Sequence, residues 1–370
     1  MTPNRDPAAI VAHDLFTAFG AGPDPAWQAL LEGRHGFSPC LRFHNKNLEC
    51  FYGALSPELD KEADHSGFFL HVLAPSILPF ADRADLFLAA TVGEIERLDD
   101  PRDQCTVDSL LERALRVFRM KQGMAVSAAC ASGNAAVCRA CTLLSAGKIE
   151  CAAVFGSDSV SEFILSGFAT LKAVSTSPLC RPYDRTRDGL LLGDAAGTAV
   201  LMPRSRAETE GLPVLGLVTG WGMSCDAAHI TAPLPDGKAL ARAIRQALER
   251  AGRSPGDVGA VIGHGTGTAY NDIMEIRALK QVFGDSPVPL LSVKGSSGHT
   301  LACAGLVQLS AALNMLRTGR IPAQTSLREP EPEAGTMLSS RERILEKNVI
   351  LSMNSGFGGL NAVLLLESVS

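Results

Sequence analysis

The chain has 370 residues, of which 46% are hydrophobic, and it carries a net charge of −5. A chain of this length buries a large core, in one domain or in two fused halves. The lack of a basic excess argues against a nucleic-acid partner. No stretch approaches the roughly eighteen apolar residues of a membrane span, and the N-terminus lacks the pattern of an export signal. We therefore expect a cytoplasmic protein with no membrane partner.

The sequence contains ten cysteines. Without an export signal we expect reduced thiols, most of them buried as small apolar residues. Cys138 and Cys141 form a C-x-x-C pair, but no second pair lies at the spacing of a structural zinc site. On one helix the two would be neighbours, which favours packing over redox chemistry. We predict no metal site.

In the first half, short apolar strands alternate with a helix. Residues 124–128 read as a strand, 130–146 as a helix of small residues ended by Gly147, and 151–155 and 198–202 as further strands. The charged stretch 203–212 reads as a loop between halves. The region before residue 120 is harder to interpret, and the polar stretch 44–66 receives no assignment.

The second half repeats this alternation. Strands are predicted at 214–219, 258–262, 290–293, 349–353 and 362–366, the last two around a glycine turn. Residues 238–251 form an amphipathic pattern with Gly252 at the helix C-cap. Residues 301–317 predict a helix ending at Gly319, apolar except for Gln308 and Asn314 near its middle. Buried strands alternating with helices favour an α/β layered fold.

One chemical motif is S-A-A-C-A-S-G at residues 127–133, where a strand leads into a helix. The unpaired N–H groups and the dipole of a helix N-terminus stabilise the thiolate of a cysteine placed there. Small neighbours would let a substrate carbonyl approach Cys130. Alternatively, Cys130 is a buried structural cysteine.

Two further motifs follow predicted strands. G-H-G-T-G-T at residues 263–268 sets His264 at a strand end beside two threonines, and it lacks the lysine of a phosphate-binding Walker loop. K-G-S-S-G-H-T at residues 294–300 sets Lys294 and His299 five residues apart before an apolar helix. The alternatives are a turn with a chance histidine and a helix-entry loop with a solvated lysine.

The fourth motif is N-S-G-F-G-G at residues 354–359, between the last two predicted strands. Its glycines allow a backbone that changes conformation, or one whose N–H groups face an oxyanion. Read alone, it is equally a hairpin turn.

Together these motifs resemble the β-ketoacyl-(acyl carrier protein) synthases of fatty acid and type II polyketide synthesis, the Cys-His-His branch of the thiolase superfamily. The resemblance runs from residue 121 to about 366 and includes R-P-Y-D (181–184) and R-D-G (187–189). A-F-G (18–20) and W-Q-A-L-L-E-G (27–33) are similar to the family's opening. It implies a duplicated α-β-α-β-α thiolase fold, with halves at residues 1–205 and 206–370.

The resemblance also implies roles for individual residues. Cys130 corresponds to the nucleophile that accepts an acyl group from an acyl carrier protein. His264 and His299 would stabilise the oxygen that becomes negative while malonyl-carrier loses carbon dioxide, as neutral donors supported by Lys294. The implied reaction is a decarboxylative Claisen condensation by an acyltransferase.

Other roles are supporting ones. Glu275 corresponds to a glutamate paired with the lysine, Thr266 and Thr268 to contacts of the pantetheine arm, and the Phe357–Gly358 turn to the oxyanion hole and the gate over the acyl tunnel. Residues 161–171 are expected to line that tunnel. Arg185 and Arg187 are candidates for docking the acidic carrier. No resident cofactor is implied, because phosphopantetheine arrives on the carrier.

The chain departs from the family in a short segment between Gly36 and Cys130, and in Asp194 and Ala195 where glutamate and glycine are usual. These departures favour a specialised polyketide or polyene pathway. The family implies a homodimer, or a heterodimer with a related ketosynthase subunit. The alternatives are a structural or chain-length-controlling partner subunit, and a non-condensing acyltransferase or thioester hydrolase.

Overall fold

Two sets of five strands share one topology. The computed structural model describes residues 6–43, 45–48, 50–95, 105–284 and 286–369. The strands of one set run in the spatial order β6-β5-β7-β9-β1 and those of the other in the order β12-β11-β15-β16-β10. In each set the outer three strands pair in parallel and the remaining pairs are antiparallel. Antiparallel pairing of β1 with β10 joins the sets into one sheet.

The strands have the following bounds. The first set comprises β1 (Ala8–Thr17), β5 (Asp85–Ala89), β6 (Gly123–Val126), β7 (Ala152–Asp158) and β9 (Ala195–Pro203). The second comprises β10 (Gly216–Cys225), β11 (Ala260–Ile262), β12 (Leu290–Leu291), β15 (Val349–Gly356) and β16 (Leu360–Glu367). Short strands lie outside these sets: β2 (Gly20–Ala21), β3 (Phe37–Pro39), β4 (Tyr52–Ala54), β8 (Leu192–Gly193), β13 (Arg320–Ile321) and β14 (Arg343–Ile344).

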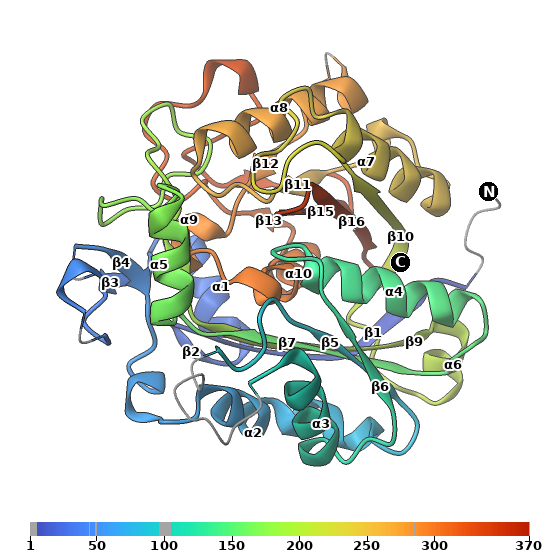
Figure 1. The fold of residues 1–370 in the computed structure, drawn as a ribbon. Helices are drawn as coiled ribbons and strands as arrows, with labels where there is room; N and C mark the ends of the chain where they lie inside the picture. Colours follow the sequence, from blue (N-terminus) through green and yellow to red (C-terminus); the bar gives the residue numbers. More distant parts are fainter. Residues whose placement is uncertain (1–5, 44, 49, 96–104, 285, 370) are drawn as a thin grey trace.

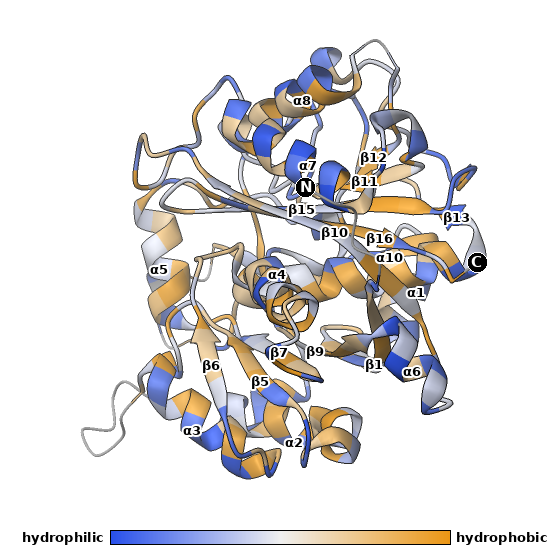
Figure 2. Ribbon diagram, turned by 90° about the vertical axis from the view of Figure 1, so that its right-hand side faces the viewer, coloured by the Kyte–Doolittle hydropathy of each residue, from blue (hydrophilic) through white to orange (hydrophobic). Residues whose placement is uncertain are grey.

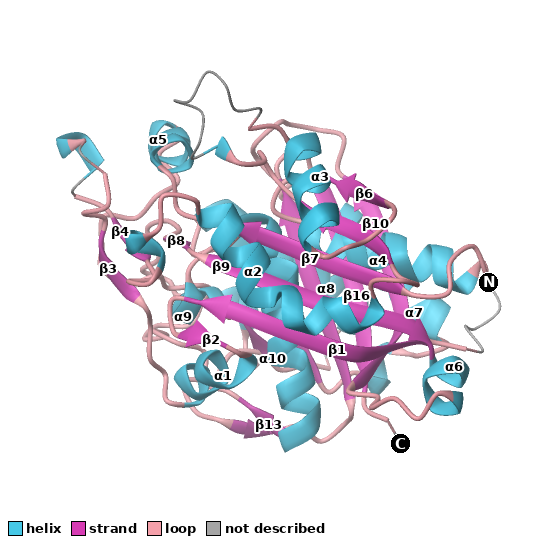
Figure 3. Cartoon of the chain, turned by 90° about the horizontal axis from the view of Figure 1, so that it is seen from below, coloured by secondary structure: helices cyan, strands magenta, loops and turns pink. Residues whose placement is uncertain are grey.

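Helices alternate with the two sets of strands in five layers (Figure 1). Helices α7 (Lys238–Ala251) and α8 (Ala269–Phe283) cover the second set, and α2 (His65–Ile77) and α3 (Val107–Val117) cover the first. Between the sets lie α4 (Ser132–Ser145) and α10 (Ala304–Thr318). From below, α2 crosses the strands of the first set (Figure 3). This arrangement confirms the predicted α-β-α-β-α layering.

The remaining helices are α1 (Pro23–Leu31), α5 (Glu162–Thr170), α6 (Arg204–Thr209) and α9 (Lys294–Ser297). The main core fills the space around α4 and α10, and separate apolar clusters lie under α2 and α3 and under α7 and α8. Figure 2 shows mostly hydrophobic strands such as β5, β6 and β16, with hydrophilic residues on the outer helices α3, α7 and α8. Burial of these apolar faces is the main force holding the layers together.

The two central helices approach closely through glycines. A Cβ on Gly133 of α4 would lie 2.7 Å from the carbonyl oxygen of Ala302 and 3.0 Å from the Cα of Gly305 on α10. Neither position accommodates a larger residue without moving a helix. Because α4 follows Cys130 and α10 follows His299, this contact fixes the spacing between the two halves of the site.

The predicted loop at 203–212 is wrong, because α6 occupies its centre. Arg204 pairs with Glu208 and Arg206 with Glu210, both at helical i,i+4 spacing, while Ala207 is buried against the sheet. The proposed division at residue 205 falls within this helix and stays a prediction. Within the part of the chain described, no helix is both long and apolar enough to cross a membrane.

Candidate active site

Cys130 lies in a tight turn between β6 and α4. Ala129 has a φ of 49°, a left-handed conformation that non-glycine residues adopt only when their surroundings impose it. Ser132 holds the turn, since its hydroxyl accepts from Ala128 N–H at 2.8 Å and donates to Ala129 O at 2.6 Å. The side chain of Cys130 therefore sits at the start of α4, as predicted, and lines a cavity.

The ionisation of Cys130 differs from the prediction. Burial raises the pKa of its thiol to about 12, while the charge of Lys294 acts in the opposite direction. A hydrogen bond from the backbone of Cys130 also lowers this pKa, but by less than the loss of solvation raises it. A neutral thiol is therefore the resting form, and its proton must be transferred when the sulfur reacts.

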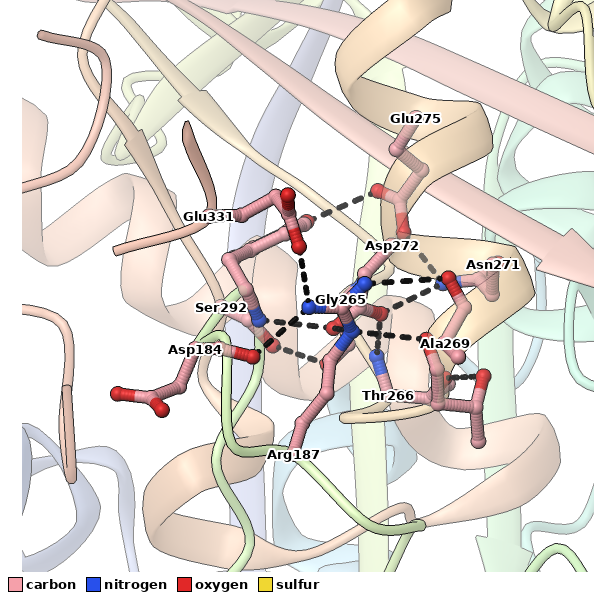
Figure 4. Close-up of polar contacts among 12 residues, drawn as sticks. Asp184, Arg187, Gly265, Thr266, Ala269, Asn271, Asp272, Glu275, Ser292 and Glu331 are labelled. Atoms are coloured by element: carbon pink, nitrogen blue, oxygen red, sulfur yellow. Dashed lines mark hydrogen bonds and ion pairs between the residues drawn. The ribbon is translucent and has the colours of Figure 1, made fainter. Parts of the chain in front are cut away.

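His264 follows β11 on a loop held by the buried carboxylate of Glu275 on α8. This carboxylate accepts the backbone N–H groups of His264 and Gly265, each at 2.7 Å. It also accepts from Tyr183 Oη at 3.0 Å and Asn271 Nδ2 at 2.6 Å. Figure 4 shows Glu275 beside Gly265 and Asn271. Glu275 thus fixes the backbone that carries His264.

Among the described residues, Glu275 forms no ion pair with Lys294, contrary to the expected contact. Lys294 begins α9, and its ammonium donates to His264 O at 2.5 Å and lies 3.4 Å from His264 Nδ1. Its influence on Glu275 acts only over a longer distance. Both groups contact His264, and they do not contact each other. Burial lowers the pKa of Lys294 and raises that of Glu275, because both lack solvent.

Two residues to which the sequence analysis gave no role support the ring of His264, Asn354 directly and Gln308 through Asn354. Asn354 of β15 places Nδ2 3.3 Å from His264 Nδ1, and Asn354 Nδ2 also donates to Gln308 Oε1 of α10 at 2.9 Å. The signal for Gln308 was present, because it is a polar residue inside an apolar helix. The signal for Asn354 was only its membership of a glycine-rich motif.

His299 lies beside His264 in the same cavity. The ring centroids are 5.2 Å apart and the planes stand at 89°. The backbone of His299 is held by Leu191 and Gly193, because its N–H donates to Leu191 O at 2.7 Å and its O accepts from Gly193. Burial lowers the pKa of both histidines well below the usual value, so both rings are neutral near pH 7.

The β15–β16 turn brings Phe357 and Gly358 to Cys130. A Cβ on Gly356 would lie 2.6 Å from Ala128 O and 3.1 Å from Cys130 N, so only glycine allows this approach. The Phe357 ring lies 5.5 Å from that of Phe168 on α5, centroid to centroid. Phe168 and Leu171 from the predicted tunnel segment line the cavity with Phe357.

The cavity has a volume of about 440 Å³ and brings together most of the predicted site. Its lining includes Cys130, His264, His299, Thr266, Thr268 and Phe357. The two threonine hydroxyls lie 2.9 Å apart. Lys294 and Glu275 do not line the cavity but lie next to His264, which does. Beyond Cys130 lies an apolar cluster that includes Ile164, Leu165 and Leu301.

Arg187 was a candidate for docking the carrier protein, but its side chain is not available for that contact. Its side chain is 6% exposed, and it pairs with Glu331 at 2.7 Å and Asp272 at 3.6 Å. It also donates to Asp184 O and Ala269 O (Figure 4). Arg187 therefore holds together the wall of the cavity, whereas Arg185 is exposed.

Two family models match the chain. The beta-ketoacyl synthase N-terminal domain matches residues 122–207, and the C-terminal domain matches residues 215–328. The chain belongs to the β-ketoacyl synthase family. Both matched regions of the synthase contain parts of the cavity, because Cys130 lies in the first and both histidines lie in the second.

Relatives of the synthase cover nearly its whole length. It is 29% identical to a 3-oxoacyl-[acyl-carrier-protein] synthase 2 from Synechocystis sp., over 94% of this chain and 95% of the relative. A protein of the same name from Vibrio cholerae is 27% identical over 97% and 98%. The solved structure of the ishigamide ketosynthase/chain length factor superposes with a TM-score of 0.91 at 26% identity, covering 99% of this chain and all of that one.

Most cysteines of the synthase outside the cavity are buried thiols, whereas Cys50 and Cys225 are exposed. Cys138 and Cys141 both lie on α4 and are buried, and all ten cysteines are free. Over the residues that the structure describes, no three His, Cys, Asp or Glu side chains converge as metal ligands.

Proposed function

We propose that this chain is a β-ketoacyl-(acyl carrier protein) synthase that condenses an acyl thioester with malonyl-carrier, in fatty acid synthesis or a specialised polyketide or polyene pathway. The observation that carries the proposal is the convergence of Cys130, His264 and His299 on one cavity, with Lys294 behind His264. An intact nucleophile favours an acyltransferase over a purely structural partner subunit.

The first half-reaction loads the acyl group. The sulfur of Cys130 attacks the carbonyl of the acyl-carrier thioester, the bond from carbon to the carrier sulfur breaks, and the thiol proton passes to the departing carrier thiol. Backbone N–H groups of Cys130 and Phe357 are the proposed oxyanion hole, since the Gly356 approach brings their segments together. The apolar cluster beside Cys130 would receive the acyl chain.

The second half-reaction forms the carbon–carbon bond. Malonyl-carrier loses carbon dioxide, and the electron pair of the broken bond develops as an enolate oxygen charge. Neutral His264 and His299 would donate hydrogen bonds to that oxygen. The enolate carbon then attacks the acyl carbonyl, the bond from the acyl carbon to the sulfur of Cys130 breaks, and the released thiolate takes up one proton from solvent. Thr266 and Thr268 on the cavity wall would contact the pantetheine arm, so no resident cofactor enters the proposal.

The proposed partners are an acyl carrier protein and a second ketosynthase subunit. The names of the Synechocystis and Vibrio relatives include acyl carrier protein, and the 26% identical structure is of a ketosynthase/chain length factor. Strand β6 ends the first set of strands, and its residues are partly exposed. An edge strand offers unpaired backbone groups to a second chain. We place a second copy, or a related subunit, against β6.

Reduced cysteines fit a reaction in the cytoplasm, and we place it there.

In a direct assay the protein is mixed with acyl-carrier and malonyl-carrier. Mass spectrometry measures the 3-oxoacyl-carrier that forms, and the carbon dioxide released is quantified in parallel. The proposal expects both products in equal amounts. Free fatty acid without carbon dioxide would instead indicate a thioester hydrolase. Absence of all products would favour the partner-subunit reading, which requires a catalytic homologue in the assay.

A further inference from the structure

A chain of buried amides runs from the central helix to the ring of His264. Gln308 of α10 is fully buried, and its Nε2 donates to Gly263 O at 2.7 Å and Met353 O at 3.3 Å. Backbone carbonyl oxygens accept hydrogen bonds and cannot donate them. The orientation of the Gln308 amide is therefore set by the backbone, and its oxygen must point the other way.

That oxygen dictates how Asn354 is turned. Gln308 Oε1 accepts from Asn354 Nδ2 at 2.9 Å and from Ser352 Oγ at 3.1 Å. Reversing the Asn354 amide would set two oxygen acceptors against each other in a site without solvent, which costs free energy. The NH₂ group of Asn354 thus faces Gln308 with one proton and has a second proton to give.

The second proton is directed at His264. Asn354 Nδ2 lies 3.3 Å from His264 Nδ1, and Lys294 Nζ lies 3.4 Å from the same nitrogen. An ammonium group has donors only, so both neighbours require Nδ1 to be an acceptor. A neutral imidazole with an accepting Nδ1 carries its proton on Nε2. Gln308 and Asn354 thereby determine which nitrogen of His264 can donate.

We propose that Gln308 and Asn354 are positioning residues that hold His264 as its Nε2–H tautomer, so that it donates a hydrogen bond to the oxygen that becomes negative during malonyl decarboxylation. The inference deepens the proposed function and rests on it for that reaction step. His299 offers a contrast, because its buried Nδ1 has no hydrogen-bond partner in the described structure. The amides of Gln308 and Asn354 therefore orient the proton of His264 but not that of His299.

The test measures the tautomer and the two half-reactions separately. Protein labelled with ¹⁵N-histidine reports protonated and unprotonated ring nitrogens at well-separated chemical shifts, and His264→Ala identifies the signals of His264. The expected wild-type result at pH 7 is a protonated Nε2 and an unprotonated Nδ1. A wild type with its proton on Nδ1 would overturn the proposal without any further variant.

Asn354→Asp places an acceptor where the donor stood. We expect the His264 proton to shift toward Nδ1 and malonyl decarboxylation to fall by up to roughly 10⁴-fold, the loss known for a catalytic histidine held in the wrong tautomer. Acylation of Cys130 should stay close to the wild-type rate. Asn354→Leu should lose less, because Lys294 still faces Nδ1.

The matched control is Asn314→Asp on α10, whose amide donates to Ser310 O within its own helix and does not contact His264. It should leave both half-reactions and the His264 signals unchanged. Equal losses of both half-reactions in Asn354→Asp, with unchanged His264 signals, would show a structural role and overturn the proposal. Because the NMR measurement needs no substrate, it stands even if the condensation assay fails.

Discussion

At the scale of single residues, burial determines the ionisation of the site. Four ionisable side chains of the site are buried: Cys130, His264, His299 and Lys294. Burial raises the pKa of the thiol and lowers the pKa of the other three groups, which favours the neutral form of each. Neutral histidines suit hydrogen-bond donation to a developing oxyanion. The only group in this set that is charged at neutral pH is Lys294, which touches His264 twice.

This leads to a pH prediction for malonyl decarboxylation. Burial lowers the pKa of Lys294 to about 8, so the ammonium is present below that pH and is lost above it. The decarboxylation rate should fall as the pH rises through about 8. Lys294→Met should be slow at every pH and should lack this alkaline limb.

Release of carbon dioxide from malonyl-carrier, measured from pH 6 to 9, checks this expectation. The exposed Lys280 on α8 provides a control, since Lys280→Met should keep the wild-type profile. A Lys294→Met profile with the same alkaline fall as wild type would assign that fall to another group.

At the scale of elements, loops after strands carry the site, and the loop that carries His264 is held by one buried carboxylate. The carboxylate of Glu275 on α8 accepts four hydrogen bonds, from His264, Gly265, Tyr183 and Asn271. In Glu275→Gln an amide NH₂ would replace one of its two oxygens and face other donors. We expect unfolding free energy to drop by about 1–3 kcal/mol for each donor left unpaired.

Urea unfolding of Glu275→Gln against the exposed Glu346→Gln measures this cost. The control should match wild type. A stability of Glu275→Gln equal to that of the control would mean that the His264 loop does not depend on this carboxylate.

The β15–β16 turn supplies a second prediction at this scale. In Gly356→Ala the new methyl group would meet Ala128 O at 2.6 Å and push the Phe357 turn away from Cys130. Acyl loading should fall by roughly 10²-fold, the effect of losing one oxyanion donor. Gly167→Ala on α5, where a Cβ meets nothing within 4 Å, is the control. Acyl loading rates measured by mass spectrometry compare the two, and similar rates would contradict the proposed role of the turn.

Several elements could be predicted from the sequence and others could not. Helix α7 has the predicted bounds because a clear apolar face ends at Gly252 in the left-handed conformation. Helix α6 was missed because its charges resemble a loop, although they pair at i,i+4. The site residues were recognised by motif, but the contact of Lys294 with His264 rather than Glu275 depends on packing that no local pattern encodes.

At the scale of the whole molecule, the two halves share one strand order and meet through α4 and α10. Cys130 enters from one half, and both histidines enter from the other. The distance between nucleophile and histidines therefore depends on the helix contact at Gly133 and Gly305 rather than on either half alone. A change at this contact should affect stability and chemistry together.

Gly305→Ala tests that dependence. Its methyl group would lie 2.8 Å from the carbonyl carbon of Gly133 and would also strike the backbone nitrogen of Asn134. We expect a loss of about 1–3 kcal/mol in unfolding free energy, typical of overpacking, together with slower condensation. Gly256→Ala, whose nearest neighbour would be Ser254 Oγ at 3.6 Å, should match wild type. Thermal or urea unfolding decides, and an unchanged Gly305→Ala would mean that the helices can move apart freely.

Intact mass spectrometry shows whether Cys130 accepts an acyl group. Wild type and Cys130→Ala are each mixed with acyl-carrier proteins of several chain lengths. We predict a gain of one acyl mass on the wild type alone, with the preferred chain length giving the fastest gain. No gain on the wild type, or an equal gain on both proteins, would contradict it.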